Sequence, residues 1–146
     1  MSDHAADTVS TILPCLSYRD APAAIEWLCR AFGFTKHAVY AEGDVVHHAE
    51  LVFGNGMVML GSVAKPGPWS QYTAQPDEIG GRATQSAYVI VSDCKAHYER
   101  AKAAGAAIVL DYEEKDYGGA GYSCRDLEGH LWSFGSYDPW RAQAGS

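Results

Sequence analysis

The chain has 146 residues, of which 47% are hydrophobic and 20% charged, a composition typical of one globular domain that excludes collagen-like, coiled-coil and intrinsically disordered proteins. Eleven Lys and Arg residues against 18 Asp and Glu residues give a formal net charge of −7. No basic cluster stands anywhere in the sequence, so the electrostatic footprint of a nucleic-acid-binding protein is missing.

Residues 11–63 are predicted to form a strand, a helix and three further strands. Asp20 stands at the expected N-cap of the helix, Pro22 lies in its first turn, and Gly33 follows where a left-handed C-terminal residue is wanted. The apolar stripe of this helix consists of Ile25, Leu28, Cys29 and Phe32. Period-two patterns predict strands at 34–40, 45–53 and 57–63.

Two short polar segments in this first half predict hairpin turns. They are residues 42–44, Glu-Gly-Asp, and the pair Asn55-Gly56. An Asn-Gly pair suits a type I′ turn, so we expect residues 55 and 56 to be the central residues of the second hairpin.

The same order of elements returns in residues 87–139. A short apolar strand, 87–91, precedes Asp93 at a second expected N-cap, and the helix then runs to Gly105. Its buried side is predicted to contain Cys94, His97, Ala101 and Ala104. Strands are expected at 106–112, 121–124 and 130–136, with the last turn at 126–129. The chain therefore reads as two βαβββ modules.

A linker, residues 64–86, joins the two modules and is rich in Pro and Gly. Connections of this length in a compact domain are usually functional or mobile. Trp69 and Tyr72 lie on it, and aromatic rings on a loop are commonly packed against something. Two interpretations stay open: the rings rest on the rim of the sheet, or the linker covers a ligand.

The closing segment 125–134, Arg-Asp-Leu-Glu-Gly-His-Leu-Trp-Ser-Phe, together with the paired strand-Asp-helix openings and residues 48–51, resembles the vicinal-oxygen-chelate superfamily. That superfamily contains glyoxalase I, extradiol dioxygenases and bleomycin- and fosfomycin-resistance proteins, and the likeness is greatest to its PhnB-like and bleomycin-resistance-like branches. The resemblance implies one α+β domain, 1–146, whose two tandem βαβββ modules form a curved mixed sheet, a cup or half-barrel, with helices on the outer face. It also implies a homodimer.

Enzymes of this superfamily hold a divalent metal in the cup, on the first and last strand of each module. The matching positions here are Leu13, Met59, Ala87 and Ser133. A divalent metal needs at least three nitrogen, oxygen or sulfur donors converging on it, which these side chains do not supply. We therefore expect no metal cofactor and a cup that still binds a ligand.

Potential metal donors cluster at one place, His47, His48 and Glu50. Strand alternation predicts that His48 and Glu50 share one face and that His47 lies on the other. Four interpretations of the pair stay open: polar side chains bonded to neighbouring strands, groups that line a ligand site, a displaced metal site, and a general base at His48 near neutral pH.

The last strand is predicted to turn Trp132 and Phe134 into the core under the helices and Ser133 into the cup. We further expect Ala87, Val89 and Val91 to face the cup, and Tyr88 and Ile90 to face the helices. The glycine-rich stretch 117–122 lacks the Lys-Ser/Thr ending of a phosphate-binding loop. Its rings, Tyr117 and Tyr122, are expected at the rim of the cup.

The four cysteines, at positions 15, 29, 94 and 124, have no CxxC or metal-type spacing, and we expect small buried side chains rather than disulfides. No apolar run approaches the roughly 18 residues of a membrane span, and the polar, acidic N-terminus lacks a signal-peptide pattern. We therefore expect a cytoplasmic protein with no membrane partner.

Two functions follow as hypotheses. The first is a metal-free protein that binds a small aromatic or cationic molecule and sequesters it, as in drug resistance. Its expected ligand-binding residues are His48, Glu50, Trp69, Tyr72, Tyr117, Tyr122 and Ser133. The alternative is a metal-dependent lyase or dioxygenase with a displaced metal site at His48 and Glu50. A metal-free enzyme that uses either residue as acid or base is a third possibility.

Overall fold

The computed structural model describes residues 3–63, 66–116 and 118–142. The chain divides into two compact units, Met1–Gln75 and Pro76–Ser146, here called unit 1 and unit 2. The boundary falls inside the predicted linker, which contributes two 3-10 turns, Ser70–Tyr72 and Pro76–Ile79.

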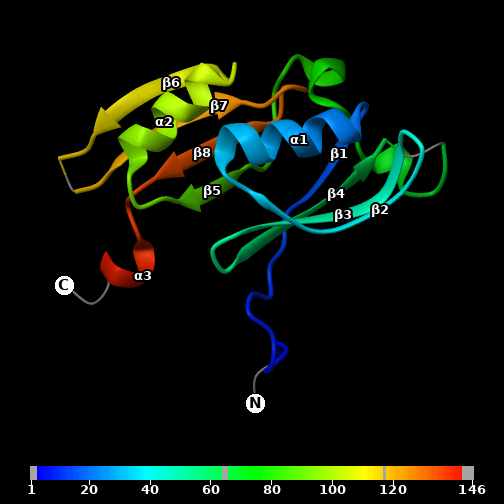
Figure 1. The fold of residues 1–146 in the computed structure, drawn as a ribbon, viewed down its shortest axis with the longest axis horizontal. Helices are drawn as coiled ribbons and strands as arrows, with labels where there is room; N and C mark the ends of the chain where they lie inside the picture. The colour runs from blue at the N-terminus through cyan, green and yellow to red at the C-terminus, as the bar shows by residue number, and fades with distance from the viewer. Residues whose placement is uncertain (1–2, 64–65, 117, 143–146) are drawn as a thin grey trace. The chain divides into compact units, whose positions relative to one another are not determined.

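Unit 1 is a four-stranded sheet with one helix on it (Figure 1). Its elements are β1 (Cys15–Tyr18), α1 (Ala21–Phe32), β2 (Thr35–Glu42), β3 (Val45–Phe53) and β4 (Gly56–Ser62). The strand order is β1-β4-β3-β2, with β1 parallel to β4 and the other pairs antiparallel. The chain thus makes one crossover through α1 and then two hairpins.

Unit 2 repeats this plan. Its elements are β5 (Ala87–Ile90), α2 (Cys94–Ala103), β6 (Ala107–Glu114), β7 (Ala120–Arg125), β8 (Leu131–Gly135) and the short α3 (Pro139–Ala142). The order β5-β8-β7-β6 and the single parallel pair, β5 with β8, match unit 1 strand for strand. The predicted α+β fold of two tandem βαβββ modules is confirmed.

Both long helices begin as predicted. The carboxylate of Asp20 accepts a hydrogen bond from the Ala23 amide at 3.2 Å, and that of Asp93 accepts one from the Ala96 amide at 3.1 Å. Each bond satisfies an amide that the helix itself leaves without a partner, which is worth about 1 kcal/mol. Gly33 ends α1 with φ of 88°, in the left-handed region that favours glycine.

The core of unit 1 is mainly apolar. Trp27, Leu28 and Phe32 on α1 are at most 2% exposed, and the rings of Trp27 and Phe32 meet edge to face with centroids 5.0 Å apart. Beneath them, Ala49 and Leu51 of β3 are fully buried. Burying a side chain of leucine or phenylalanine size stabilises the fold by roughly 1.5–3 kcal/mol.

The core of unit 2 mixes apolar and polar groups. Trp132 and Phe134 are buried, as predicted, and the ring of Phe134 lies 4.3 Å from that of His97 on α2. The buried Asp126 carboxylate accepts from the indole Nε1 of Trp132 at 3.0 Å and from the backbone amides of Glu128 and His130. The predicted closing turn thus carries its own buried acceptor.

The second hairpin of unit 1 turns one residue earlier than the Asn55-Gly56 prediction requires. Phe53 pairs with Gly56, so the central residues are Gly54 and Asn55, and of these two only Gly54 has a positive φ, 58°. A glycine at the first central position is typical of a type II′ turn. The type I′ prediction was therefore wrong, while the hairpin itself is confirmed.

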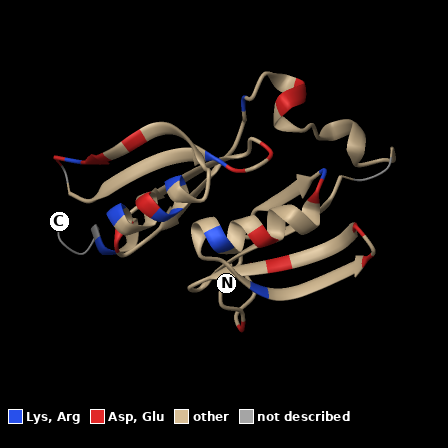
Figure 2. Ribbon diagram, turned by 45° about the horizontal axis from the view of Figure 1, so that its top comes forward, with Lys and Arg blue, Asp and Glu red and all other residues tan. Residues whose placement is uncertain are grey.

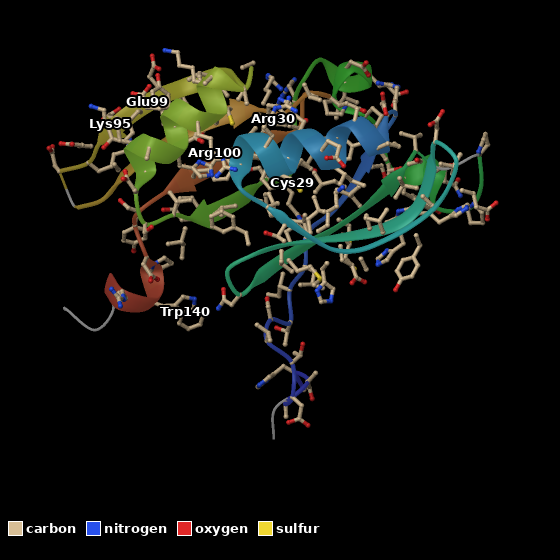
Figure 3. The ribbon with its side chains drawn as sticks, viewed as in Figure 1. Cys29, Arg30, Lys95, Glu99, Arg100 and Trp140 are labelled. Carbon is tan, nitrogen blue, oxygen red and sulfur yellow. The ribbon has the colours of Figure 1, made fainter. Side chains whose placement is uncertain are left out.

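The helices carry their charged residues outward. Lys95 and Glu99 are exposed on α2 (Figure 3). On α3, the apolar Trp140 is also exposed, at 86%. Among the described residues, no helix combines the length and the hydropathy that crossing a membrane requires.

Candidate functional site

Each sheet has one face covered by its own helix and an opposite face, here called the helix-free face. In β3 the buried Ala49 and Leu51 point toward α1, so His48 and Glu50, which alternate with them, lie on the helix-free face. The predicted pairing of His48 and Glu50 on one face is confirmed.

Four side chains of β2 and β3 form a polar and aromatic cluster, here called the β2–β3 cluster: His37, Tyr40, His48 and Glu50. The imidazole Nε2 of His48 lies 2.8 Å from Oε2 of Glu50, and Nε2 of His37 lies 3.8 Å from Oε1 of the same carboxylate. The ring of Tyr40 stacks on that of His48 with centroids 6.1 Å apart and an interplanar angle of 24°. Glu50 is therefore shared by two imidazoles.

Two β-bulges shape this cluster. Tyr40 pairs with His48 and Ala41 with Val46, so His47 is an extra residue in β3, and His37 is likewise extra in β2. The simple alternation that was expected to separate His47 from His48 is interrupted at this point. His47 instead reaches back to Glu42, with Nε2 3.2 Å from Oε1.

The sequence did not indicate His37 or Tyr40 as site residues. Their contacts depend on the register of β2 against β3, which the bulges shift by one residue at each place. The alternating pattern of strand 34–40 was the available signal, but it could not tell which residues of β2 would lie beside His48 and Glu50.

On β8, Ser133 lies on the face opposite the buried Trp132 and Phe134, as predicted. Its hydroxyl is 2.7 Å from that of Ser123 on β7, so the two serine side chains are hydrogen-bonded to each other. Tyr88 pairs with Ser133 across the parallel ladder and is 47% exposed, and its hydroxyl donates to the Tyr137 carbonyl at 2.8 Å.

The expected orientation of β5 was wrong. Ala87 pairs with Trp132 and Val89 with Phe134, and paired residues of a ladder point to the same face, so both lie on the helix side. Tyr88 and Ile90 take the helix-free face instead. The prediction placed Ala87 by its distance along the chain from the N-cap Asp93. That distance does not determine the register of β5 against β8.

Tyr122 was expected at the rim of the cup, but it is only 3% exposed and lies in the core of unit 2. Its hydroxyl is 2.6 Å from Nδ1 of His97 on α2, and its ring stacks on Phe134. Burial, followed by the nearby thiols of Cys124 and Cys94, raises the pKa of the hydroxyl well above its usual range. The ring therefore packs under α2, on the opposite face from Ser133. Tyr117 lies outside the described residues.

The two predicted aromatic residues of the linker lie together. The rings of Trp69 and Tyr72 have centroids 6.3 Å apart, yet the residues are 72% and 74% exposed. Three residues further on, the buried Gln75 donates from Nε2 to the Ser17 carbonyl of β1 at 2.9 Å. This part of the linker is thus anchored to unit 1 with two exposed rings on it.

The residues at the family's metal positions do not fit a divalent metal. Leu13 and Ala87 have no donor atom, Met59 offers a thioether, and the Ser133 hydroxyl is bonded to Ser123. Across residues 3–63, 66–116 and 118–142, no group of three or more His, Cys, Asp or Glu side chains is arranged to hold a metal ion.

The cysteines are not uniformly buried. Cys94 and Cys124 are buried, but Cys29 is partly exposed and Cys15 is exposed, so the expectation of four buried side chains was wrong. Burial raises the pKa of the Cys124 thiol to about 12, and the neighbouring Asp126 carboxylate adds to this. None of the four forms a disulfide within the described structure.

Comparison with solved structures finds the same fold in proteins of several bacteria. TioX from Micromonospora sp. ML1 is 38% identical, with a TM-score of 0.68 over 86% of this chain and 97% of that one. The fosfomycin resistance protein FosX from Mesorhizobium loti is 12% identical, with a TM-score of 0.63 over 92% and 97%. FosX from Listeria monocytogenes, determined as a mutant with Mn(II) and a dihydroxypropylphosphonic acid, is also 12% identical, with a TM-score of 0.62 over 87% and 89%.

A search of curated proteins gives no match. The family model of the glyoxalase/bleomycin resistance protein/dioxygenase superfamily matches residues 3–134, which is most of the chain and includes every strand except the last residue of β8. Together with the 38% identity to TioX over nearly the whole of that protein, this match shows that the chain belongs to the glyoxalase/bleomycin resistance protein/dioxygenase superfamily.

Proposed function

We propose that this protein binds a small organic molecule and sequesters it, without the metal chemistry of its enzymatic relatives. The observation that carries the proposal is the set of side chains at the family's metal positions, a leucine, a methionine, an alanine and a serine. Such a set supplies no Lewis acid site, whereas the fold retains sheet faces that can contact a ligand.

The helix-free faces favour an aromatic or cationic ligand. On the helix-free face of unit 1, Tyr40 is 60% exposed. On that of unit 2, Tyr88 is 47% and Leu110 67% exposed. Within either unit, exposed aromatic and apolar side chains commonly mark a binding surface. The net charge of −7 favours cations over anions. Because the superfamily includes bleomycin resistance proteins, we extend the proposal to the sequestration of a toxic compound of this chemistry.

We further propose that the protein is a cytoplasmic homodimer. One chain has a mass of 15.8 kDa, so light scattering coupled to size-exclusion chromatography should give twice that value at micromolar concentration. A mass of one chain across the whole concentration range would refute the dimer and leave the ligand-binding proposal intact.

The first test is the metal content of protein purified without a polyhistidine tag, measured before and after dialysis against EDTA, with the melting temperature followed alongside. We expect substoichiometric metal and an unchanged melting temperature. One tightly bound metal per chain, with a lower melting temperature after its removal, would contradict the proposal and favour an enzyme with a metal site near His48 and Glu50.

The second test is a thermal-shift screen of aromatic, cationic and glycopeptide compounds. A ligand that binds only the folded protein stabilises it by RT ln(1 + [L]/Kd), about 2.7 kcal/mol at a concentration one hundred times Kd. We expect at least one aromatic or cationic compound to raise the melting temperature in proportion to the logarithm of its concentration. A screen in which no compound does so would count against the proposed function.

A further inference from the structure

The β2–β3 cluster combines a carboxylate with an aromatic surface on one face of the unit 1 sheet. Tyr40 and His48 are directly paired across the two strands, and their rings stack. Glu50 follows two residues after His48 on the same face, with its side chain 26% exposed. A ring surface and a negative charge therefore lie side by side, within reach of solvent.

Among residues 3–63, 66–116 and 118–142, no Lys or Arg side chain pairs with the Glu50 carboxylate. Its partners in the described part of the chain are the imidazoles of His37 and His48. Lys36, the basic residue of the β2–β3 hairpin, pairs with Glu26 of α1. The same hairpin also carries Glu42 and Asp44, so acidic residues outnumber basic ones on it (Figure 2).

The residues that pair with Glu50 across the sheet carry no charge. Across the sheet, Glu50 pairs with Ala38 on β2 and with Met59 on β4, and Met59 in turn pairs with Cys15 on β1. Glu50 is therefore flanked by the methyl group of Ala38 on one side and the unbranched, polarisable thioether of Met59 on the other. Thioethers and aromatic rings make favourable contacts with flat π-systems, and neither carries a charge that would repel a cation.

We infer that the β2–β3 cluster is the part of the binding site that recognises a planar aromatic cation. The ligand's ring system packs on the Tyr40 and His48 rings, and its positive charge is paired with Glu50. The inference rests on the proposed function, since it names the ligand class and the residues that select it. It makes Glu50 the charge-selecting residue and Tyr40 the ring-selecting residue.

The test uses three fluorescent probes that share a three-ring frame and differ in charge: 9-aminoacridine, which is cationic, 9-anthracenemethanol, which is neutral, and anthracene-9-carboxylate, which is anionic. Their dissociation constants are measured by fluorescence titration on the full chain. Wild-type protein is expected to bind the cation most tightly and the anion most weakly. An exposed charge pair combined with a cation–π contact is worth about five-fold to ten-fold in affinity.

Two pairs of variants separate charge from ring. Glu50→Gln should weaken the cation about five-fold and leave the neutral probe unchanged. Its matched control is Glu42→Gln, which removes the same charge from the same hairpin beside another histidine, His47, and should leave both probes unchanged. Tyr40→Leu should weaken both the cation and the neutral probe, whereas Tyr40→Phe, which keeps the ring, should retain wild-type binding.

The outcomes are distinguishable. Equal binding of the cationic and neutral probes, with Glu50→Gln without effect, would overturn the inference while the ligand-binding function stands. An equal loss in Glu50→Gln and Glu42→Gln would also overturn it, because the effect would then be one of net charge. If none of the three probes binds, the inference fails. If the thermal-shift screen is also negative, the proposed function fails as well.

Discussion

Units 1 and 2 share one topology, yet they distribute polar groups in opposite ways. In unit 1 the helix side is mainly apolar, with Trp27, Leu28 and Phe32 at its centre, and the bonded pair His48 and Glu50 lies on the helix-free face. In unit 2 the polar groups lie inside: His97 bonds to Tyr122, and Asp126 bonds to an indole and to backbone amides.

This difference indicates separate roles for two copies of one fold. Polar groups that are buried and paired hold one packing arrangement, because any of them left without a partner is costly. Polar groups on an exposed face cost little and remain available to a ligand. A carboxylate and two imidazoles lie on the helix-free face of unit 1, whereas the same face of unit 2 carries a serine pair and the exposed Tyr88 and Leu110.

The largest expected contrast between the units is in thiol reactivity. The thiolate is the nucleophile, and with a pKa of about 12 only about one Cys124 thiol in ten thousand is ionised at pH 8. Iodoacetamide should therefore modify the exposed Cys15 of unit 1 at least about 100-fold faster than Cys124, as followed by peptide mass spectrometry. In urea all four cysteines should react. Comparable rates in the folded protein would show that Cys124 is not buried.

Asp126→Ala should give the largest loss of stability. The substitution leaves the Trp132 indole and two backbone amides without their acceptor, at a cost of about 2–4 kcal/mol in the free energy of unfolding. The matched change in the corresponding hairpin of unit 1, Asn55→Ala, should cost less than about 1 kcal/mol, because residue 55 lies in an exposed turn. Urea denaturation measures both, and similar losses would remove this distinction between the units.

Tyr122→Phe should cost about 1–2 kcal/mol, because it removes the hydroxyl that lies 2.6 Å from Nδ1 of the buried His97. Tyr40→Phe makes the same chemical change on the helix-free face of unit 1, where the residue is 60% exposed, and should change stability by less than about 0.5 kcal/mol. Equal effects in urea denaturation would mean that the hydroxyl of Tyr122 contributes nothing specific to the core.

The sequence predicted those features that depend on local spacing. The caps at Asp20 and Asp93 and the burial of Trp132 and Phe134 follow from patterns within about ten residues, because helix and strand periods are local properties. The α+β fold followed from the repetition of that plan and from the closing motif.

Features that depend on pairing between distant segments were not predicted. The β5–β8 register brought Tyr88, rather than Ala87, beside Ser133, and the bulge at His47 displaced the expected alternation. The sequence of a strand does not show which residue of the neighbouring strand will pair with it. A change of one residue in the register moves every side chain of the strand to the opposite face of the sheet. For the same reason the stacking of Tyr40 on His48 could not be foreseen.

The smallest expected effect is also the one that should be the same in both units. Asp20→Ala and Asp93→Ala each remove one hydrogen bond to a first-turn amide, 3.2 and 3.1 Å long, so each should cost about 1 kcal/mol in urea denaturation. Because the two caps share no partner, the double variant should lose the sum of the two. A cost in one unit more than twice that in the other would mean that the caps, and not only the cores, differ between the copies. Equal losses in the free energy of unfolding would mean that the two units differ only in the side chains on the faces of their sheets.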